Sequence, residues 1–102
     1  MIQRIVLFQF QPQTPAEEIA GCVDLMRALP AQVPEIQTYQ VAYNRKGRGE
    51  RYYVSLIAGF ADDAALQRYE THPANQALAR RLVQSIGAVT IFDAELPESA
   101  PA

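Results

Sequence analysis

The segment that most constrains the fold is the strand at the start of the chain, because it is apolar on both of its faces. Residues 2–10 are rich in branched and aromatic side chains and are bounded by Gln11-Pro12, which is typical of a β-strand. Alternate positions are apolar on each face: Val6, Phe8 and Phe10 on one, Ile5 and Leu7 on the other. A strand of this kind must be covered on both faces in the folded protein.

The next segment has the pattern of a helix. Thr14 is a candidate N-cap, Pro15 suits the first helical position, and Glu17 lies where a capping-box carboxylate reaches back. One apolar stripe then follows at helical spacing: Ile19, Cys22, Val23, Met26 and Leu29. The two prolines that come after the stripe end the helix and carry the chain to the next strand.

Two strands and a short connection are predicted in the middle of the chain. Residues 36–44 alternate loosely between apolar and polar, and residues 51–60 form a second run with strand composition. Because the glycine-bearing connection 45–50 is brief, the two strands are expected to form an antiparallel hairpin. We interpret its basic residues as a solvated tip rather than a phosphate site, since Glu50 and the acidic balance of the chain oppose anion binding.

The last third of the chain is predicted to hold two helices and a strand. Asp62-Asp63 begins a short helix, and Pro73 begins another that stops at Gly87. The inward side of the second helix holds three apolar residues: Leu78, Leu82 and Ile86. Residues 88–95 have the composition of the final strand.

The order strand, helix, strand, strand, helix, strand predicts an α+β domain with the ferredoxin-like βαββαβ topology. Its sheet is antiparallel with the helices on one face, which leaves the other face bare in a monomer. By parity we expect the bare face to carry these apolar residues: Val6, Phe8, Phe10, Leu56, Phe60, Val89 and Ile91. At about 25 cal/mol per Å² this surface is too costly to leave in water, so we predict a homodimer in which two sheets pack face to face.

Composition narrows the classes of function. The 102 residues suffice for one domain without metal or disulfide, predicted over 1–96 with a flexible tail at 97–102. A net charge of −2 gives no field that attracts nucleic acid. Cys22 is the single cysteine; it fits a reducing compartment and is expected to be a core residue rather than a nucleophile. We therefore expect a cytoplasmic protein with no nucleic-acid or membrane partner.

Four motifs in order make the sequence similar to the stress-responsive A/B barrel (Dabb) family of the dimeric α/β-barrel superfamily. They are an opening strand at 4–10, a Leu-Pro linker at 29–34, a Tyr-x-x-His-Pro-x-His-like segment at 69–75 and a closing Val-x-x-Phe-Asp at 89–93. The resemblance covers residues 1–96. It implies a homodimer whose paired sheets form a barrel, with an apolar pocket between the sheet and the helices of each subunit.

The resemblance also limits the chemistry. One plant member of the family is a polyketide cyclase, and its aldol condensation depends on the second histidine of the His-Pro-x-His segment and on the tyrosine before it. Here the tyrosine is Tyr69, but Asn75 replaces the second histidine and Arg4 replaces the histidine of the opening strand. Because both replacements fall where that activity needs an imidazole, the cyclase reaction is not expected of this chain.

His72 and Tyr69 are the candidate catalytic residues. His72 is the only side chain whose ordinary pKa lies near neutrality, which makes it the candidate for proton transfer. The alternative, which we favour, is that it packs at the helix start and hydrogen-bonds the backbone there. Tyr69 either orients a ligand oxygen or belongs to the core. Since no other histidine or cysteine lies near His72 in the sequence, no metal and no cofactor are expected.

Arg4 and Asn75 are candidate polar points of the pocket. Arg4 shares the parity of Val6 and is expected to point to the barrel face that the dimer covers, where a guanidinium is costly unless it is paired. Asp93 on the last strand is one candidate partner and an anionic ligand is another; a strand end with access to water, which we favour, is the third alternative. Asn75 either binds a ligand carbonyl or is tied to neighbouring backbone.

The pocket is therefore expected to have apolar walls and few polar groups. The predicted lining is Val6, Phe8, Leu56, Tyr69, Leu78, Val89 and Ile91, with Arg4, His72 and Asn75 as the polar points. The first hypothesis is a stress-related homodimer that binds a small apolar or aromatic molecule with little or no catalysis. The second is a cofactor-free lyase, cyclase or oxygenase that uses Tyr69 and His72, with His72 projecting into the cavity. The third is a structural or interaction protein whose barrel is filled by side chains.

Overall fold

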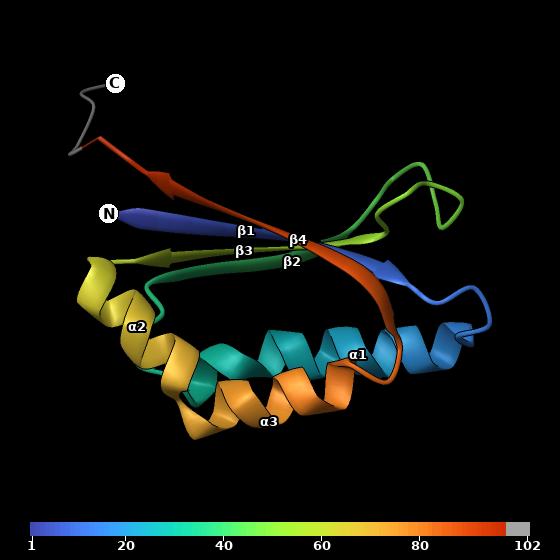
Figure 1. Ribbon diagram of the computed structural model, residues 1–102, viewed down its shortest axis with the longest axis horizontal. Coiled ribbons are helices and arrows are strands. Elements are labelled where there is room, and N and C mark those ends of the chain that lie inside the picture. Colours follow the sequence, from blue (N-terminus) through green and yellow to red (C-terminus); the bar gives the residue numbers. More distant parts are fainter. Residues whose placement is uncertain (98–102) are drawn as a thin grey trace.

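The structure is a computed structural model that describes residues 1–97, in which three α-helices pack on a four-stranded sheet (Figure 1). The elements are β1 (Ile2–Phe10), α1 (Ala16–Ala28), the 3₁₀ turn η1 (Leu29–Ala31), β2 (Thr38–Tyr43), β3 (Val54–Phe60), α2 (Asp63–Thr71), α3 (Pro73–Leu82) and β4 (Ile86–Glu95). Neighbouring strands are antiparallel in the order β2-β3-β1-β4. This confirms the predicted α+β ferredoxin-like fold; most of the predicted tail, 98–102, lies outside the described residues.

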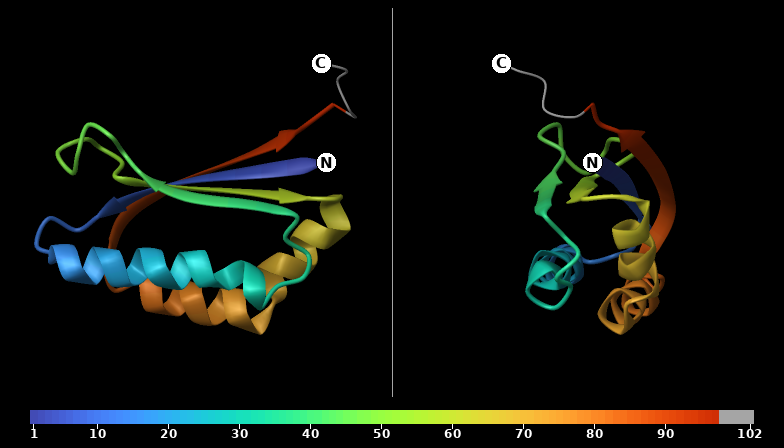
Figure 2. Two further views of the ribbon diagram at one scale, coloured as in Figure 1. Left: turned by 180° about the vertical axis from the view of Figure 1, so that it is seen from behind. Right: turned by 90° about the vertical axis from the view of Figure 1, so that its left-hand side faces the viewer.

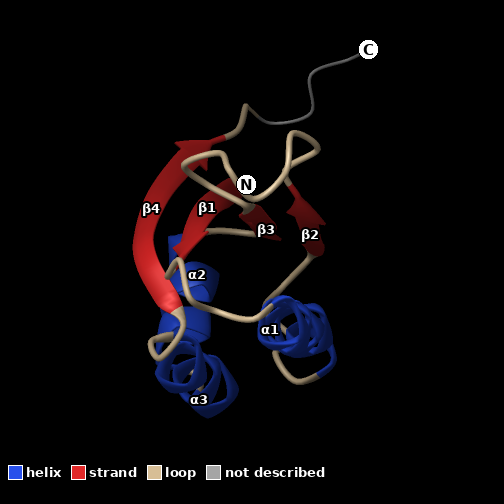
Figure 3. Ribbon diagram, turned by 90° about the vertical axis from the view of Figure 1, so that its right-hand side faces the viewer, coloured by secondary structure: helices blue, strands red, loops and turns tan. Residues whose placement is uncertain are grey.

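All helices lie on one side of the sheet, where α1 and α3 run side by side and α2 leads from β3 into α3 (Figures 1 and 3). The other side of the sheet carries no helix in the described chain, and the connection between β2 and β3 rises there (Figure 2). The predicted stripe of α1 meets the sheet, because Ile19, Cys22, Val23 and Met26 are all buried in the core. Burial raises the pKa of the Cys22 thiol, which is the behaviour of a core cysteine.

The start of α1 differs from the prediction. Pro15 occupies the capping position in an extended conformation, and no side chain caps the helix, so neither Thr14 nor Glu17 plays the predicted role. The buried Thr14 hydroxyl instead donates to the Ser85 carbonyl at 3.4 Å. The prediction was wrong because the Thr14 side chain turns toward the α3–β4 connection and is therefore not available to the first turn of its own helix.

The end of α3 also differs from the prediction. The helix ends at Leu82, and Gly87 lies within β4 rather than at a helix terminus. Ile86 pairs with Phe10 across an irregularity in the β1–β4 ladder, so the strand begins earlier than residue 88. The sequence alone did not reveal this pairing, because the ladder partner of Ile86 is 76 residues away.

The hairpin between β2 and β3 has a longer connection than predicted, because the ladder stops at the Tyr43–Val54 pair. The Asn44 side chain donates to the Tyr52 carbonyl at 3.0 Å, and the Tyr53 amide donates across to the Phe8 carbonyl at 2.9 Å. These bonds satisfy the backbone of the connection outside a regular strand.

The two faces of the sheet are assigned oppositely to the prediction. Val6, Phe8, Phe10, Leu56 and Phe60 point toward the helices and expose at most 7% of their surface. Val89 and Ile91 share that side but lie on the edge strand, where they are 49% and 55% exposed. The prediction that these residues form the bare face was therefore wrong. The physical reason is that a strand apolar on both faces does not show which parity the helices will cover.

The face without helices carries the other apolar parity. Ile57, Ile5 and Phe92 form one row across β3, β1 and β4, and Leu7 lies beside this row. Phe92 is 61% exposed, and Ile5, Leu7 and Ile57 are only half-buried. We refer to these four residues, Leu7 included, as the open-face row.

None of the helices within residues 1–97 has the length and apolar character needed to cross a membrane.

Candidate functional site

A cavity of about 180 Å³ lies between the helix-covered side of the sheet and helices α2 and α3. It is lined by Arg4, Val6, Phe8, Leu56, Tyr69, Asn75, Leu78, Ala79, Leu82 and Ile91. The strands supply one wall and the helices the other, so the lining is fixed on regular elements rather than on loops. Apolar walls with a few convergent polar groups are the ordinary form of a small-molecule site.

Most of the predicted site residues meet in this cavity, and two do not. Val89 lies on the same side of the sheet but at its exposed edge, outside the lining. His72 is the second exception. Sequence reasoning missed Ala79 and Leu82, although helical spacing from Asn75 and Leu78 places both on the side of α3 that faces the cavity.

His72 is placed at the junction of the two helices. It follows the last residue of α2 and caps α3, where its Nδ1 accepts a hydrogen bond from the Ala74 amide at 3.1 Å. The imidazole thus satisfies a free backbone N–H at a helix start, as the favoured alternative expected. Among residues 1–97, no group of three or more His, Cys, Asp or Glu side chains is placed to hold a metal ion.

Arg4 is paired within its own subunit. Its Nε and Nη2 each donate to one oxygen of Asp93 at 2.8 Å, and its Nη1 lies 3.5 Å from Glu70 Oε2. The Arg4 side chain is 12% exposed, while Asp93 and Glu70 are 38% and 47% exposed. The hydrogen bonds that Arg4 donates to Asp93 raise the pKa of Arg4 against the effect of burial and lower the pKa of Asp93. Of the three alternatives for Arg4, the structure shows the Asp93 pair.

Tyr69 is the residue of α2 that lines the cavity. It is 6% exposed, and its ring packs on Phe60 with 4.9 Å between centroids. Burial raises the pKa of the Tyr69 phenol, the Arg4 charge opposes this shift, and Glu70 adds to it. The phenol is therefore protonated at neutral pH and acts toward a ligand as a hydrogen-bond donor rather than as a base.

Tyr39 is a polar residue near this site that sequence reasoning did not select. Tyr39 pairs with Ala58 across the ladder, and Ala58 in turn pairs with Arg4, so the three lie in one row on the helix-covered side. Within residues 1–97 the buried Tyr39 hydroxyl has no hydrogen-bond partner. Burial raises the pKa of this phenol, and the nearby Tyr69 adds to the shift. The available signal was that Tyr39 shares the parity of the buried Val41.

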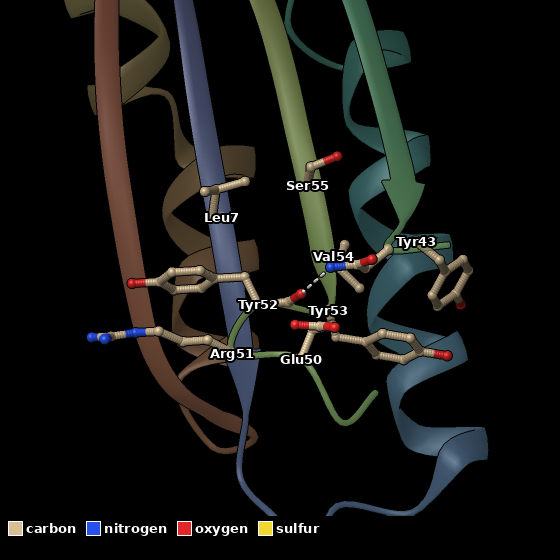
Figure 4. Close-up of a pocket in the computed structure, with 9 residues that line it drawn as sticks. Leu7, Tyr43, Glu50, Arg51, Tyr52, Tyr53, Val54 and Ser55 are labelled. Carbon is tan, nitrogen blue, oxygen red and sulfur yellow. Dashed lines mark hydrogen bonds between the residues drawn. The ribbon is translucent and has the colours of Figure 1, made fainter. Parts of the chain in front are cut away.

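A larger hollow of about 410 Å³ lies on the opposite side of the sheet, beneath the β2–β3 connection (Figure 4). Leu7 and Ser55 form its floor, and Glu50, Arg51 and Tyr52 come from the connection. The Tyr52 hydroxyl is 2.6 Å from Thr90 Oγ1, which ties the connection to β4. We regard the smaller cavity as the candidate site, because strands and helices supply its walls and most of the predicted site residues line it, whereas much of the lining of the larger hollow comes from the β2–β3 connection.

Comparison with known proteins places the chain among related sequences and folds. The model of the stress responsive A/B barrel domain matches residues 2–96. An uncharacterized protein of Streptomyces coelicolor is 34% identical over 80 residues, which is 76% of this chain and 81% of that protein.

Solved structures share the fold. A dimeric ferredoxin-like protein of unknown function from Bacteroides fragilis has a TM-score of 0.81 at 26% identity, covering 93% of this chain and 95% of that one. A Dabb family protein from Mesorhizobium loti has a TM-score of 0.74 at 24% identity, with 96% and 97% covered. A hydroxynitrile lyase from Passiflora edulis has a TM-score of 0.84 at 13% identity, with 98% and 96% covered. Because the identities of the last two are so low, these two structures show a similarity to this chain in fold alone.

Proposed function

Since this chain belongs to the stress-responsive A/B barrel family, we propose that it is a homodimer that binds a small organic molecule in a cavity of each subunit. The observation that carries the proposal is the cavity of about 180 Å³ between the sheet and helices α2 and α3. Its walls are apolar and its polar groups converge from Arg4, Tyr69 and Asn75. This composition favours a ligand that is mostly apolar and is oriented by one polar group.

The proposed dimer forms through the side of the sheet that has no helices. The open-face row leaves apolar surface on that side, including a Phe92 ring that is 61% exposed. The Bacteroides fragilis protein of the same fold is dimeric, which supports a homodimer. Packing two such faces against each other removes both open-face rows from water, and an exposed apolar face is the usual mark of such an interface.

The test of ligand binding is a titration of ¹⁵N-labelled protein with a panel of small aromatic fragments. We expect at least one fragment to shift the Asn75 side-chain amide together with backbone amides of α3. Leu78→Trp fills the cavity and should abolish these shifts, because Leu78 lines it. Val83→Trp is the matched control, since Val83 is 69% exposed just beyond the same helix and lies outside the cavity lining. Equal loss of binding in both variants, or binding unaffected by either, contradicts the proposed site.

A second candidate function is a cofactor-free lyase, cyclase or oxygenase. The position of the Tyr69 phenol in the cavity beside the Arg4 charge favours it, and the Passiflora edulis hydroxynitrile lyase shows that the fold supports an enzyme. It requires Tyr69 to act as a proton donor; the structure does not support the predicted projection of His72 into the cavity, because His72 caps α3 and lies outside the lining. Turnover of aromatic or polyketide-like compounds that survives both Tyr69→Phe and His72→Ala would exclude this assignment.

The third hypothesis, a structural protein with a filled interior, is disfavoured by the same cavity. A filled interior leaves no room for a ligand, whereas the helix-covered side contains about 180 Å³. The stress-related role and the cytoplasmic location stay predictions.

A further inference from the structure

We infer that the cavity selects an uncharged aromatic molecule over a carboxylate of the same shape, and that Asp93 sets this selectivity. The inference rests on the proposed function and specifies its ligand class. Among the cavity-lining residues that the structure describes, Arg4 is the one with a formal charge. The charge that a ligand meets therefore depends on what neutralises Arg4.

The Arg4 guanidinium is neutralised before any ligand arrives. Nε and Nη2 each donate to Asp93 at 2.8 Å in a bidentate pair, and the third nitrogen, Nη1, lies 3.5 Å from Glu70 Oε2. Each nitrogen of the guanidinium thus already faces a carboxylate. An incoming carboxylate would lose its hydration and meet a cation that two acidic groups have compensated, so it would gain little from Arg4.

The remaining polar groups of the lining suit a neutral acceptor. Tyr69 contributes a phenol and Asn75 a primary amide, and both donate hydrogen bonds without carrying charge. A ketone, aldehyde or amide oxygen accepts from such groups at a small desolvation cost. A carboxylate needs charged or multiple donors to repay its larger cost.

The volume of the cavity is sufficient for one aromatic ring. An engineered protein cavity of about 150 Å³ lined by aliphatic and aromatic side chains holds benzene. The cavity here measures about 180 Å³ and is walled by Val6, Phe8, Leu56, Leu78 and Leu82. A six-membered aromatic ring with one small carbonyl substituent is the matching class of molecule.

The test compares acetophenone with benzoate, which have the same number of non-hydrogen atoms but differ in charge at pH 7. Binding is measured by titrating ¹⁵N-labelled protein and following the Asn75 side-chain amide. We expect the wild type to bind acetophenone more tightly than benzoate by on the order of tenfold or more. This comparison needs no variant, so it holds even if a substitution impairs folding.

Three variants assign the selectivity to Asp93. Asp93→Asn leaves Arg4 with Glu70 alone and should shift the preference toward benzoate by on the order of tenfold. The double variant Arg4→Gln/Asp93→Asn removes both charges and should restore the preference for acetophenone. Glu95→Gln is the matched control, because it removes one negative charge from the same strand at a residue that is 80% exposed and outside the cavity lining. It should leave the preference unchanged.

The outcomes separate this inference from the proposed function. If benzoate binds the wild type in the cavity as tightly as acetophenone, or if Asp93→Asn and Glu95→Gln behave alike, the selectivity is refuted while the ligand site stands. If neither compound shifts cavity residues in any of these proteins, both the ligand class and the proposed site are contradicted.

Discussion

Replacing Phe92 by serine should dissociate the proposed homodimer without unfolding the subunit. Phe92 lies in the open-face row, opposite Ile5 on the neighbouring strand, and is 61% exposed in the subunit. An aromatic side chain presents about 200 Å², so about 120 Å² of the ring is available to bury. At about 25 cal/mol per Å², the partner subunit's surface would stabilise each ring by about 3 kcal/mol.

The expected effect on assembly is large. A twofold interface contains the residue twice, so the dimer loses about 6 kcal/mol, which weakens association by on the order of 10⁴-fold. The assay is sedimentation equilibrium over a dilution series, accompanied by thermal unfolding of the subunit. Val83→Ser is the matched control, because Val83 is 69% exposed but lies on the helix side. The reasoning is refuted if Phe92→Ser assembles as tightly as the wild type, or if Val83→Ser is the variant that dissociates.

Two further predictions concern the subunit itself. Asp62→Ala should lower the free energy of unfolding by about 1 kcal/mol, because Asp62 caps α2 by accepting a hydrogen bond from the Ala65 amide at 2.8 Å. Chemical denaturation measures this loss, and Asp63→Ala is a control that leaves the cap intact. Arg4 lowers the pKa of Asp93 in the folded state. The pair therefore stabilises the fold at pH values above the pKa of Asp93 in the unfolded chain, about 3.9, and this contribution is lost as the pH falls through the lower pKa of the folded state. Denaturation from pH 6 to pH 2 should therefore show a shallower loss of stability in Asp93→Asn than in the wild type, and equal slopes would argue against the pair.

The order of elements could be predicted from the sequence because each element carries its own local pattern. The α1 stripe through Cys22 and Met26 repeats at helical spacing, and both residues are fully buried. Pro73 marks the start of α3, as expected. Periodicity of this kind depends on residues close together in the chain, so it can be read without knowing the tertiary structure.

The side of the sheet that the helices cover could not be predicted in the same way. β1 is apolar on both parities, so Phe8 and Leu7 were equivalent candidates for the core. The choice is made by tertiary packing, which buries Phe8 and leaves Leu7 on the open side. The start of β4 at Ile86 was not predicted for a related reason, because it depends on hydrogen bonds to β1, a strand at the other end of the chain.

The cavity residues were accessible from the sequence only in part. Tyr69, Asn75 and Leu78 belong to a recognisable segment, and the pair between Arg4 and Asp93 was one of the alternatives derived from strand parity. Tyr39, which lies near the cavity but outside its lining, was not selected because its position depends on the row across β3, where Ala58 separates it from Arg4. The register between strands that are distant in sequence is what a single sequence conveys least.

The most direct test of the proposed site is a set of isotope-filtered nuclear Overhauser measurements between acetophenone and the methyl groups of the labelled protein. We expect contacts from the aromatic protons to Leu78, Leu82 and Ile91, which line the cavity between the sheet and the helices. Contacts confined to Leu7 and Ile57 would place the ligand on the opposite side of the sheet and would contradict the proposed site.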